Sequence, residues 1–459
     1  DRVAELIRDY ADVGIGLARP SGDQLSLCEE AVPGSRGRVG AYQHHMPATT
    51  FAGSMFVATS ELGDRRGPYL GETTGRARVP VHFDPLEVAQ RNLPTVTTIS
   101  GRPGGGKTTL AQLMAAQAGF RGTSVLYVDP KRETDGLAGL LGAGDVEVID
   151  LDEAAAGILD PWAVADDPDE GAMLGIDALK LLLPGLTSEE ERIVARACEE
   201  QSQGQRPSLG GVVRQLRALD AADAQRLGDS LRYYERLRTA RLLFSPGGSA
   251  PPATPARLTI LQMGGITLPD ASTPRQDNTW AERAAVAVMF LAAALARQLA
   301  QRSRTEAKLL VFDEAWALTN SRQGRALIER LARMGRSQNT AVMLVSQNAR
   351  DFQDESIRNC ASAMFAFHAQ DRNEAVAVLD LLGIAPTEEH IRAVVGLRAP
   401  LRNASDGSSA PGAECIFRDP DGRVGTVFID LVLPELRAAF DTTPGPAQES
   451  ASRPVAEVV

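Results

Sequence analysis

The chain has 459 residues, of which 43% are hydrophobic and 23% charged, and its formal net charge is −11 at pH 7. This composition is ordinary for a globular protein of two or three domains, and the negative charge argues against a wholly basic nucleic-acid binder. The four cysteines lie far apart without a C-x-x-C pair, so neither a zinc cluster nor a disulfide framework is suggested. A reducing cytoplasm is therefore the default compartment.

The acidic charge is concentrated in one stretch. Thirteen acidic and two basic residues lie between Asp129 and Glu170, so the rest of the chain is balanced and leaves room for local basic surfaces. No signal peptide is visible, and the uncharged run Ala284–Ala296 is too short and too rich in alanine to span a bilayer, so we expect a buried helix there. The chain begins at Asp1 rather than at a methionine, which is compatible with a piece of a longer protein whose front carries a membrane contact.

Residues 1–75 form an N-terminal region that we interpret as a partial α+β domain. The pattern predicts a helix over Asp1–Tyr10 and a strand over Thr50–Thr59. The neighbouring His44 and His45 have no third ligand at a recognisable spacing, so we expect solvent-facing histidines rather than a metal site.

A phosphate-binding loop follows the next strands. A short strand begins at Val79, a second covers Val96–Ile99, and a helix covers Leu110–Ala118. Between the last two stands the G-x-x-x-x-G-K-[ST] spacing of a P-loop, whose consecutive glycines turn backbone N–H groups toward phosphate oxygens. The residues expected to bind nucleotide are Gly101, Pro103, Gly104, Gly105, Gly106, Lys107, Thr108 and Thr109.

Two side chains of this loop have distinct roles in the interpretation. Lys107 bridges the β- and γ-phosphates, and the hydroxyl of Thr108 binds Mg²⁺. ATP and Mg²⁺ are therefore the expected cofactors.

The strand Ser124–Asp129 continues a parallel α/β sheet, in which functional groups gather at the carboxyl ends of the strands. Asp129 and Glu133 lie at such an end. One interpretation is that these side chains contact the nucleotide site or a neighbouring subunit. The other is that they are simply solvent-exposed residues of a loop.

An all-helical insertion is predicted over 169–244, after a first part of the core over 76–168. Overlapping capping boxes in Thr187–Glu191 start one of its helices. The proline- and glycine-rich stretch 245–256 is expected to be a flexible connector.

The core resumes over 257–441 with a strand at Arg257–Met263, a buried helix at Trp280–Gln301 and a strand at Lys308–Phe312. Asp313 and Glu314 follow the last of these, at the tip of a buried strand where a P-loop enzyme needs a magnesium ligand and a base for the attacking water. We assign the metal to Asp313 and the base to Glu314.

A helix with a charged face rich in arginine follows, on which the spacings are three and four: Arg322, Arg325, Glu329, Arg333 and Arg336. Such a face is either solvated or places an arginine in the nucleotide site of the adjacent subunit. The strand Ala341–Val345 ends in Ser346-Gln347-Asn348, where a polar side chain either orients water or caps the strand.

The remaining elements are peripheral. We predict a strand over Ile357–Phe367, a helix over Arg372–Leu382, and a hairpin whose turn is Asp421-Gly422. Residues 442–459 are rich in proline and serine and are expected to be disordered.

With these pieces in order, the chain resembles the TraC-type conjugation and type IV secretion ATPases (VirB-class traffic ATPases) of the HerA/FtsK superfamily. The resemblance covers residues 69 to 385, and the string Asp313-Glu314-Ala315-Trp316 is its most discriminating part. The other matching features are Leu70-Gly71, Phe83-Asp84-Pro85, the loop Gly101–Thr108, Asp129-Pro130, Gly335-Arg336 and Ser346-Gln347-Asn348.

The resemblance implies a RecA-like P-loop NTPase fold, a mainly parallel sheet flanked by helices, and assembly into a homo-hexamer. It makes Lys107 and Thr108 the phosphate and magnesium contacts, Glu314 the catalytic base, Gln347 the γ-phosphate sensor and Arg336 a finger acting in trans. Arg333 and Arg372 are rivals for the finger.

The expected function is an ATP-hydrolysing motor of a conjugation-like type IV secretion apparatus, at the cytoplasmic face of the cell membrane. Its expected partners are other secretion components, including a peripheral contact with the inner-membrane complex. One alternative is a DNA-translocating coupling protein or HerA/FtsK-type pump, and another is a non-catalytic ATP-dependent assembly switch.

Overall fold

The fold is taken from a computed structural model, which describes residues 2–12, 14–17, 21–32, 34–37, 39–40, 47–53, 61–75, 78–142, 144–247, 256–269, 273–399 and 412–440. The chain divides into two units, 1–59 and 60–459. The first contains helices α1 (Arg2–Asp12), α2 (Gln24–Glu30) and α3 (Ala48–Gly53). The helix expected near the start is present as α1. Residues 50–53 of the expected strand are helical, while 54–59, His44 and His45 lie outside the described residues.

The second unit is built on one eleven-stranded sheet of the described residues, in the order β2-β1-β11-β10-β9-β3-β8-β7-β4-β6-β5. The strands from β9 to β5 in this order are parallel, whereas β10, β11, β1 and β2 extend the sheet in antiparallel fashion. The strands are β1 (Asp64–Thr73), β2 (Pro80–His82), β3 (Val96–Ser100), β4 (Ser124–Asp129), β5 (Val146–Asp150), β6 (Leu258–Gln262), β7 (Lys308–Phe312), β8 (Thr340–Ser346), β9 (Ala361–Phe367), β10 (Ala413–Arg418) and β11 (Val424–Ile429).

Strand β1 falls within the range that the sequence placed in an N-terminal region. It pairs with β11, with Gly71 opposite Ile429, and so belongs to the main sheet. The mostly parallel α/β fold expected from the sequence is confirmed.

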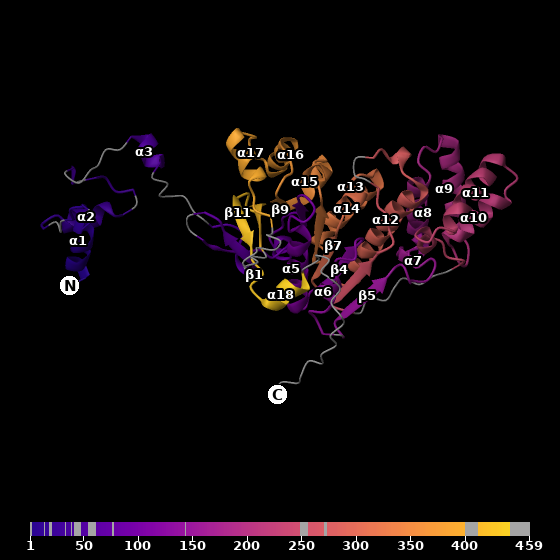
Figure 1. Ribbon diagram of the computed structural model, residues 1–459, viewed down its shortest axis with the longest axis horizontal. Coiled ribbons are helices and arrows are strands. Elements are labelled where there is room, and N and C mark those ends of the chain that lie inside the picture. Colours follow the sequence, from indigo (N-terminus) through magenta and orange to yellow (C-terminus); the bar gives the residue numbers. More distant parts are fainter. Residues whose placement is uncertain are drawn as a thin grey trace, which may run out of the picture. The chain divides into compact units, whose positions relative to one another are not determined.

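Helices cover both faces of the sheet because alternate side chains of each buried strand point to opposite sides. On β7, Leu309 and Val311 join the core under α5, whereas Leu310 and Phe312 join the core with α12 and α14. Figure 1 shows α5 and α18 on one side and α14 to α17 on the other. The helices that follow are α4 (Glu87–Gln90), α5 (Lys107–Phe120), α6 (Asp135–Ala138), α12 (Trp280–Gln301), α13 (Trp316–Thr319), α14 (Arg322–Gly335), α15 (Glu355–Cys360), α16 (Arg372–Leu382), α17 (Glu388–Val395) and α18 (Pro434–Ala439), with 3₁₀ turns η3 (Arg275–Asp277) and η4 (Ala349–Phe352).

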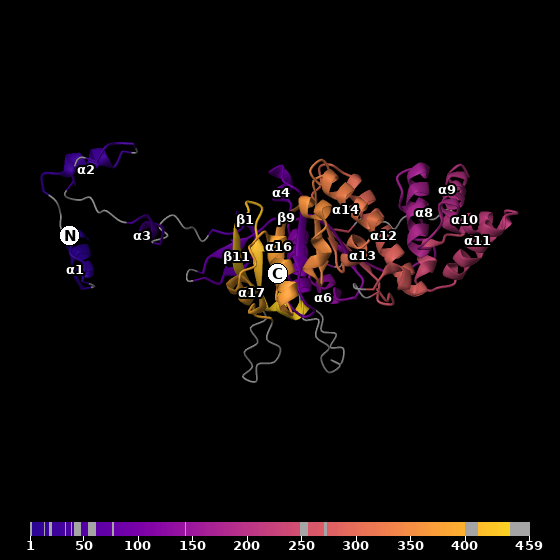
Figure 2. The same cartoon turned by 90° about the horizontal axis from the view of Figure 1, so that it is seen from above.

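A helical section stands between β5 and β6 in the chain and gathers at one end of the second unit, away from β1 and β11 (Figure 2). It contains α7 (Pro161–Val164), α8 (Pro168–Leu182), α9 (Ser188–Ser202), α10 (Leu209–Ala218), α11 (Ala222–Glu235) and the 3₁₀ turn η2 (Ala240–Leu243). The expected capping box is formed by Thr187 and Glu190.

One buried carboxylate ties this section together. Asp160, the residue before α7, accepts hydrogen bonds from the backbone N–H groups of Trp162 (3.2 Å), Leu209 (3.0 Å) and Ser245 (3.0 Å). These donors come from α7, from the start of α10 and from the segment after η2. Burial raises the pKa of Asp160 to about 7, against the lowering effect of the three N–H donors.

Helix α12 is the buried helix that the sequence predicts. It is long and apolar enough to cross a membrane, but 83% of its most apolar window is buried inside the protein. Its residues from Ala284 to Ala296 all belong to the core. The apolar composition of α12 is thus accounted for by packing between the sheet and α8.

Candidate active site

Four neighbouring parallel strands bring the predicted site residues together. Strands β3, β8, β7 and β4 are consecutive in the sheet, so their carboxyl ends lie at one edge. The P-loop follows β3, Gln347 follows β8, Asp313 and Glu314 follow β7, and a loop beginning at Pro130 follows β4. Segments up to about 250 residues apart in the chain therefore meet at one place.

The P-loop takes a backbone path that requires glycine. Gly101, Gly104 and Gly106 have φ angles of 144°, 70° and 105°. A Cβ on Gly101 would lie 2.6 Å from the Cβ of Phe367, and one on Gly106 would lie 2.7 Å from the Cβ of Ala413. The loop is thus pressed against β9 and β10.

The first turn of α5 completes the cradle. Gly106 precedes the helix and Lys107, Thr108 and Thr109 form its first turn, so the positive end of the helix dipole faces the loop. The Nζ of Lys107 donates to the carbonyl oxygen of Arg102 at 2.9 Å, across the loop that contains Pro103 and Gly105. Burial lowers the pKa of Lys107, and the carboxylates of Asp313 and Glu314 oppose that effect. The geometry fits an anion held by the loop amides and this ammonium.

Asp313 and Thr108 form an oxygen pair beside the cradle. The Oγ1 of Thr108 lies 3.4 Å from Oδ2 of Asp313. Burial raises the pKa of Asp313 to about 7, and the nearby charges of Glu314 and Asp129 add to the rise. A hydroxyl and a buried carboxylate among like charges favour a hard cation beside them, so these two residues fit Mg²⁺.

The carboxylate of Glu314 is almost completely enclosed, with 4% of its side chain exposed. It accepts from Nε1 of Trp316 at 2.5 Å and forms an ion pair with Lys131. Burial tends to raise the pKa of Glu314, but the charge and hydrogen bond of Lys131, with Gln347 and Trp316, hold it below its usual value. The backbone of Glu314 is in the left-handed region, at φ 53°, a conformation that costs energy for a residue with a Cβ.

Gln347 contacts the same carboxylate. Its Nε2 lies 3.0 Å from Oε1 and 3.1 Å from Oε2 of Glu314. The preceding residue, Ser346, donates its hydroxyl to Asp351 and so fixes the end of β8. The sensor and base predicted from distant motifs are therefore direct neighbours.

The loop after β4 contributes a residue that the sequence did not single out. Asp129 accepts from the N–H of Lys131 (3.1 Å) and from the N–H (2.9 Å) and hydroxyl (2.6 Å) of Thr134, so it closes its own turn. The carbonyl of Glu133 accepts from Gln112 of α5 at 2.8 Å. Lys131, between them, is the residue that reaches Glu314. Only the adjacency of β4 and β7 reveals this contact.

None of the three candidate arginines contacts the site within the described residues of this chain. The Nη1 of Arg336 donates to the carbonyl of Asn92 at 3.2 Å, near the amino end of β3 and hence at the opposite edge of the sheet. Arg333 pairs with Glu329 at 3.1 Å, and Arg372 pairs with Glu388. Strand β3 has five residues, which at about 3.3 Å each puts Arg336 on the order of 15 Å from the P-loop.

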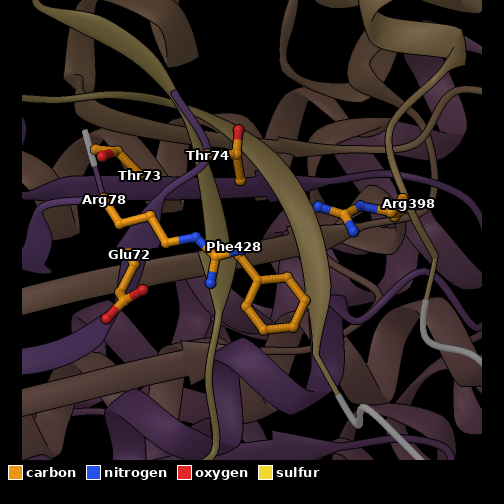
Figure 3. A pocket seen from close by; sticks show the side chains of 6 residues that line it. All are labelled: Glu72, Thr73, Thr74, Arg78, Arg398 and Phe428. Atoms are coloured by element: carbon orange, nitrogen blue, oxygen red, sulfur yellow. The ribbon is translucent and has the colours of Figure 1, made fainter. Parts of the chain in front are cut away.

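A small cavity of about 150 Å³ lies in the antiparallel part of the sheet, away from the predicted residues. Figure 3 shows Arg78 and Arg398 on either side of Phe428. Arg398 is already bonded to Glu414, with Nε 2.8 Å from Oε1. The cavity is lined by Glu72, Thr73, Thr74, Arg78, Arg398 and Phe428.

Comparison with known proteins assigns most of the chain to one family. The family model of the AAA-like domain matches residues 83–440, which include every predicted site residue. The chain belongs to the AAA-like domain family. The matched range of this AAA-like domain begins just after β2 and ends with α18.

One solved structure and one protein sequence are similar to this chain. The structure of VirB4 of Thermoanaerobacter pseudethanolicus is 19% identical, covers 82% of this chain and 100% of that chain, and superposes with a TM-score of 0.64. This likeness confirms the fold implied by the motifs. The uncharacterized protein YddE of Bacillus subtilis (strain 168) is 23% identical over 95% of this chain, which spans 55% of YddE.

Proposed function

We propose that this chain is the Mg-dependent, ATP-hydrolysing motor of a conjugation-like type IV secretion apparatus. One observation carries the proposal: Thr108, Asp313, Glu314 and Gln347 lie in a chain of contacts at the mouth of a P-loop, with 3.4 Å between Thr108 and Asp313 and 3.0 Å between Gln347 and Glu314. A site that only binds nucleotide does not need a second buried carboxylate, Glu314, beside the proposed magnesium ligands Thr108 and Asp313. The secretion task is supported by the motif resemblance and by the shared fold.

Each residue has a role in this proposal. The loop amides and Lys107 bind the phosphates, and Thr108 and Asp313 hold Mg²⁺, which neutralises charge on the phosphate oxygens when bound. Glu314 accepts a proton from the attacking water, and Gln347 orients that water and senses the γ-phosphate. Arg336 of an adjacent copy completes the site, which requires a ring such as a homo-hexamer.

The proposed location is the cytoplasmic face of the cell membrane, with other secretion components as partners and a peripheral contact with the inner-membrane complex. Movement of a substrate or assembly of a channel component would follow from changes in subunit contacts during turnover. DNA is one substrate that this scheme admits.

Steady-state ATP turnover tests the enzymatic part. We expect Glu314→Gln to lower kcat by about a hundredfold or more, because it removes the base and keeps the shape. Calorimetry should show ADP binding unchanged in Glu314→Gln and lost in Lys107→Ala. Unchanged turnover in Glu314→Gln, with assembly lost in Lys107→Ala, would establish a switch instead.

The substrate is tested by repeating the turnover assay with DNA. An increase in rate with DNA, together with DNA binding that weakens steeply with salt, would favour a DNA pump. The absence of both effects would favour transport or assembly of protein components.

A further inference from the structure

Within the described part of the chain, three donors occupy both oxygens of the Glu314 carboxylate. A carboxylate offers about four lone-pair positions, and here Lys131 and Gln347 contact Oε1 while Trp316 and Gln347 contact Oε2. A general base must lie within hydrogen-bond reach of the water whose proton it takes. In this conformation Glu314 is therefore closed to water, and one donor must leave before it can act.

Of the three donors, Lys131 is the one whose side chain can move away from the Glu314 carboxylate. Trp316 is 6% exposed and packed in the core, and Gln347 is held at the end of β8. The side chain of Lys131 is 40% exposed and ends in a flexible four-carbon stem. Its backbone is fixed, since its N–H donates to Asp129, so the ammonium can move without the loop.

A phosphate bound at the P-loop would be a second anion, besides the Glu314 carboxylate, with which the ammonium of Lys131 can pair. Lys131 pairs with Glu314, whose N–H donates to Asp313 at 2.9 Å, and Asp313 lies 3.4 Å from Thr108 in the first turn after the P-loop, so the ammonium lies on the side of the cradle. Its charge also contributes to the lowered pKa of Lys107. A phosphate held beside Lys107 is attracted by both cations and competes with Glu314 for Lys131. Of the nucleotide's phosphates, only the γ-phosphate is present in ATP and absent in ADP.

We propose that Lys131 is a latch that keeps Glu314 closed until the γ-phosphate of a bound nucleoside triphosphate draws its ammonium away. The inference rests on the proposed function, because it takes Glu314 as the base. Lys131 acts through Glu314 and is a positioning residue. Hydrolysis removes the γ-phosphate, and the latch then closes again.

The indole of Trp316 reports the state of the latch, because its N–H is bonded to the carboxylate that Lys131 releases. The chain has three tryptophans, so labelling with 5-fluorotryptophan gives three ¹⁹F resonances. The Trp316 resonance is the one missing from Trp316→Phe. The experiment adds Mg²⁺ with either ADP or a non-hydrolysable ATP analogue, and calorimetry measures the binding of each.

We expect the analogue to move the Trp316 resonance and ADP to leave it in place. In Lys131→Met the nucleotide-free resonance should already lie near the analogue position of the wild type and should not move further. Lys131→Arg should restore the wild-type response. Arg132→Met is the matched control, because Arg132 is the next residue of the same loop but pairs with Asp150 at 3.1 Å; it should respond as the wild type does.

The outcomes separate the latch from the proposed function. Equal movement with ADP and the analogue, or a wild-type response in Lys131→Met, would overturn the latch while leaving nucleotide binding intact. The comparison of ADP with the analogue needs no variant, so it decides even if Lys131→Met does not fold. If calorimetry detects neither nucleotide in the wild type, the proposed function fails, and the latch fails with it.

Discussion

At the scale of single residues, the site shows what a motif can and cannot specify. The identities of Lys107, Thr108, Asp313 and Glu314 follow from spacing and from strand ends, because the chemistry of a P-loop admits few other residue types. Lys131 has no such signal. An isolated lysine after a strand is common, and its importance depends on β4 lying beside β7, which the sequence does not encode locally.

The hydroxyl of Thr108 is the residue-scale feature easiest to test. Thr108→Val keeps the shape of the side chain and removes the oxygen that lies 3.4 Å from Asp313. We expect the Mg²⁺ concentration for half-maximal turnover to rise at least about tenfold, as for loss of a metal-site contact. Thr108→Ser keeps the hydroxyl and should stay close to the wild type. Identical Mg²⁺ curves for the two variants would remove Thr108 from the metal site.

At the scale of elements, Asp160 connects parts of the helical section that are far apart in the chain. Asp160→Ala leaves two buried N–H groups and one partly buried N–H group without acceptors, so we expect the free energy of unfolding to fall by about 3 kcal/mol or more. Asp167→Ala is the control, because Asp167 caps α8 at the surface with one N–H and should cost only about 1 kcal/mol. Urea denaturation measures both, and equal losses would contradict the connecting role.

The same carboxylate predicts a pH dependence. The pKa of Asp160 is about 7 in the folded chain, against an ordinary value of 3.8, so the folded state holds the proton more tightly than the unfolded state. This contribution to stability is complete below pH 3.8 and is lost as the pH rises through about 7. At about 1.4 kcal/mol per pKa unit it amounts to roughly 4 kcal/mol.

Asp160→Asn removes the titrating group. Denaturation series from pH 4 to 8 should show stability falling with pH more steeply in the wild type than in Asp160→Asn. Parallel curves would show that Asp160 does not titrate in this range.

The sequence predicted correctly those helices and strands in which a run of apolar residues ends at polar or capping residues. Lys308–Phe312 and the buried helix α12 are examples. Strand β5 (Val146–Asp150) was missed because it lies at the edge of the sheet, is only partly buried, and has two acidic residues among its five. The strand expected over Ile357–Phe367 begins only at Ala361, because Asp354 caps a short helix, α15, by accepting from the N–H of Ser356. Side-chain capping here prevailed over an apolar pattern.

At the scale of the whole molecule, the position of Arg336 sets a condition on assembly. It lies at the amino edge of the parallel strands and the P-loop lies at the carboxyl edge. A chain that uses Arg336 in catalysis must therefore lend it to another copy through a head-to-tail contact.

Mixing two inactive variants tests this condition. Arg336→Ala lacks the finger and Glu314→Gln lacks the base, so each alone should lose most turnover. In a randomly mixed ring of equal parts, a site works when an Arg336→Ala copy receives the arginine of a Glu314→Gln copy, so about one quarter of the wild-type rate should return. Arg333→Ala is the control and should keep its rate, because its guanidinium pairs on the surface with Glu329. Full activity of Arg336→Ala alone would exclude Arg336.

Gly106 of the P-loop packs closely against Ala413, which is far away in the chain. With 2.7 Å between the Cβ of Ala413 and the place where a Cβ of Gly106 would stand, no space remains for a side chain at Gly106. Ala413 is the first residue of β10 and follows Gly412. We therefore expect a displacement of β10 along its length to press on the P-loop or release it, and so to couple the antiparallel half of the sheet to the affinity for phosphate.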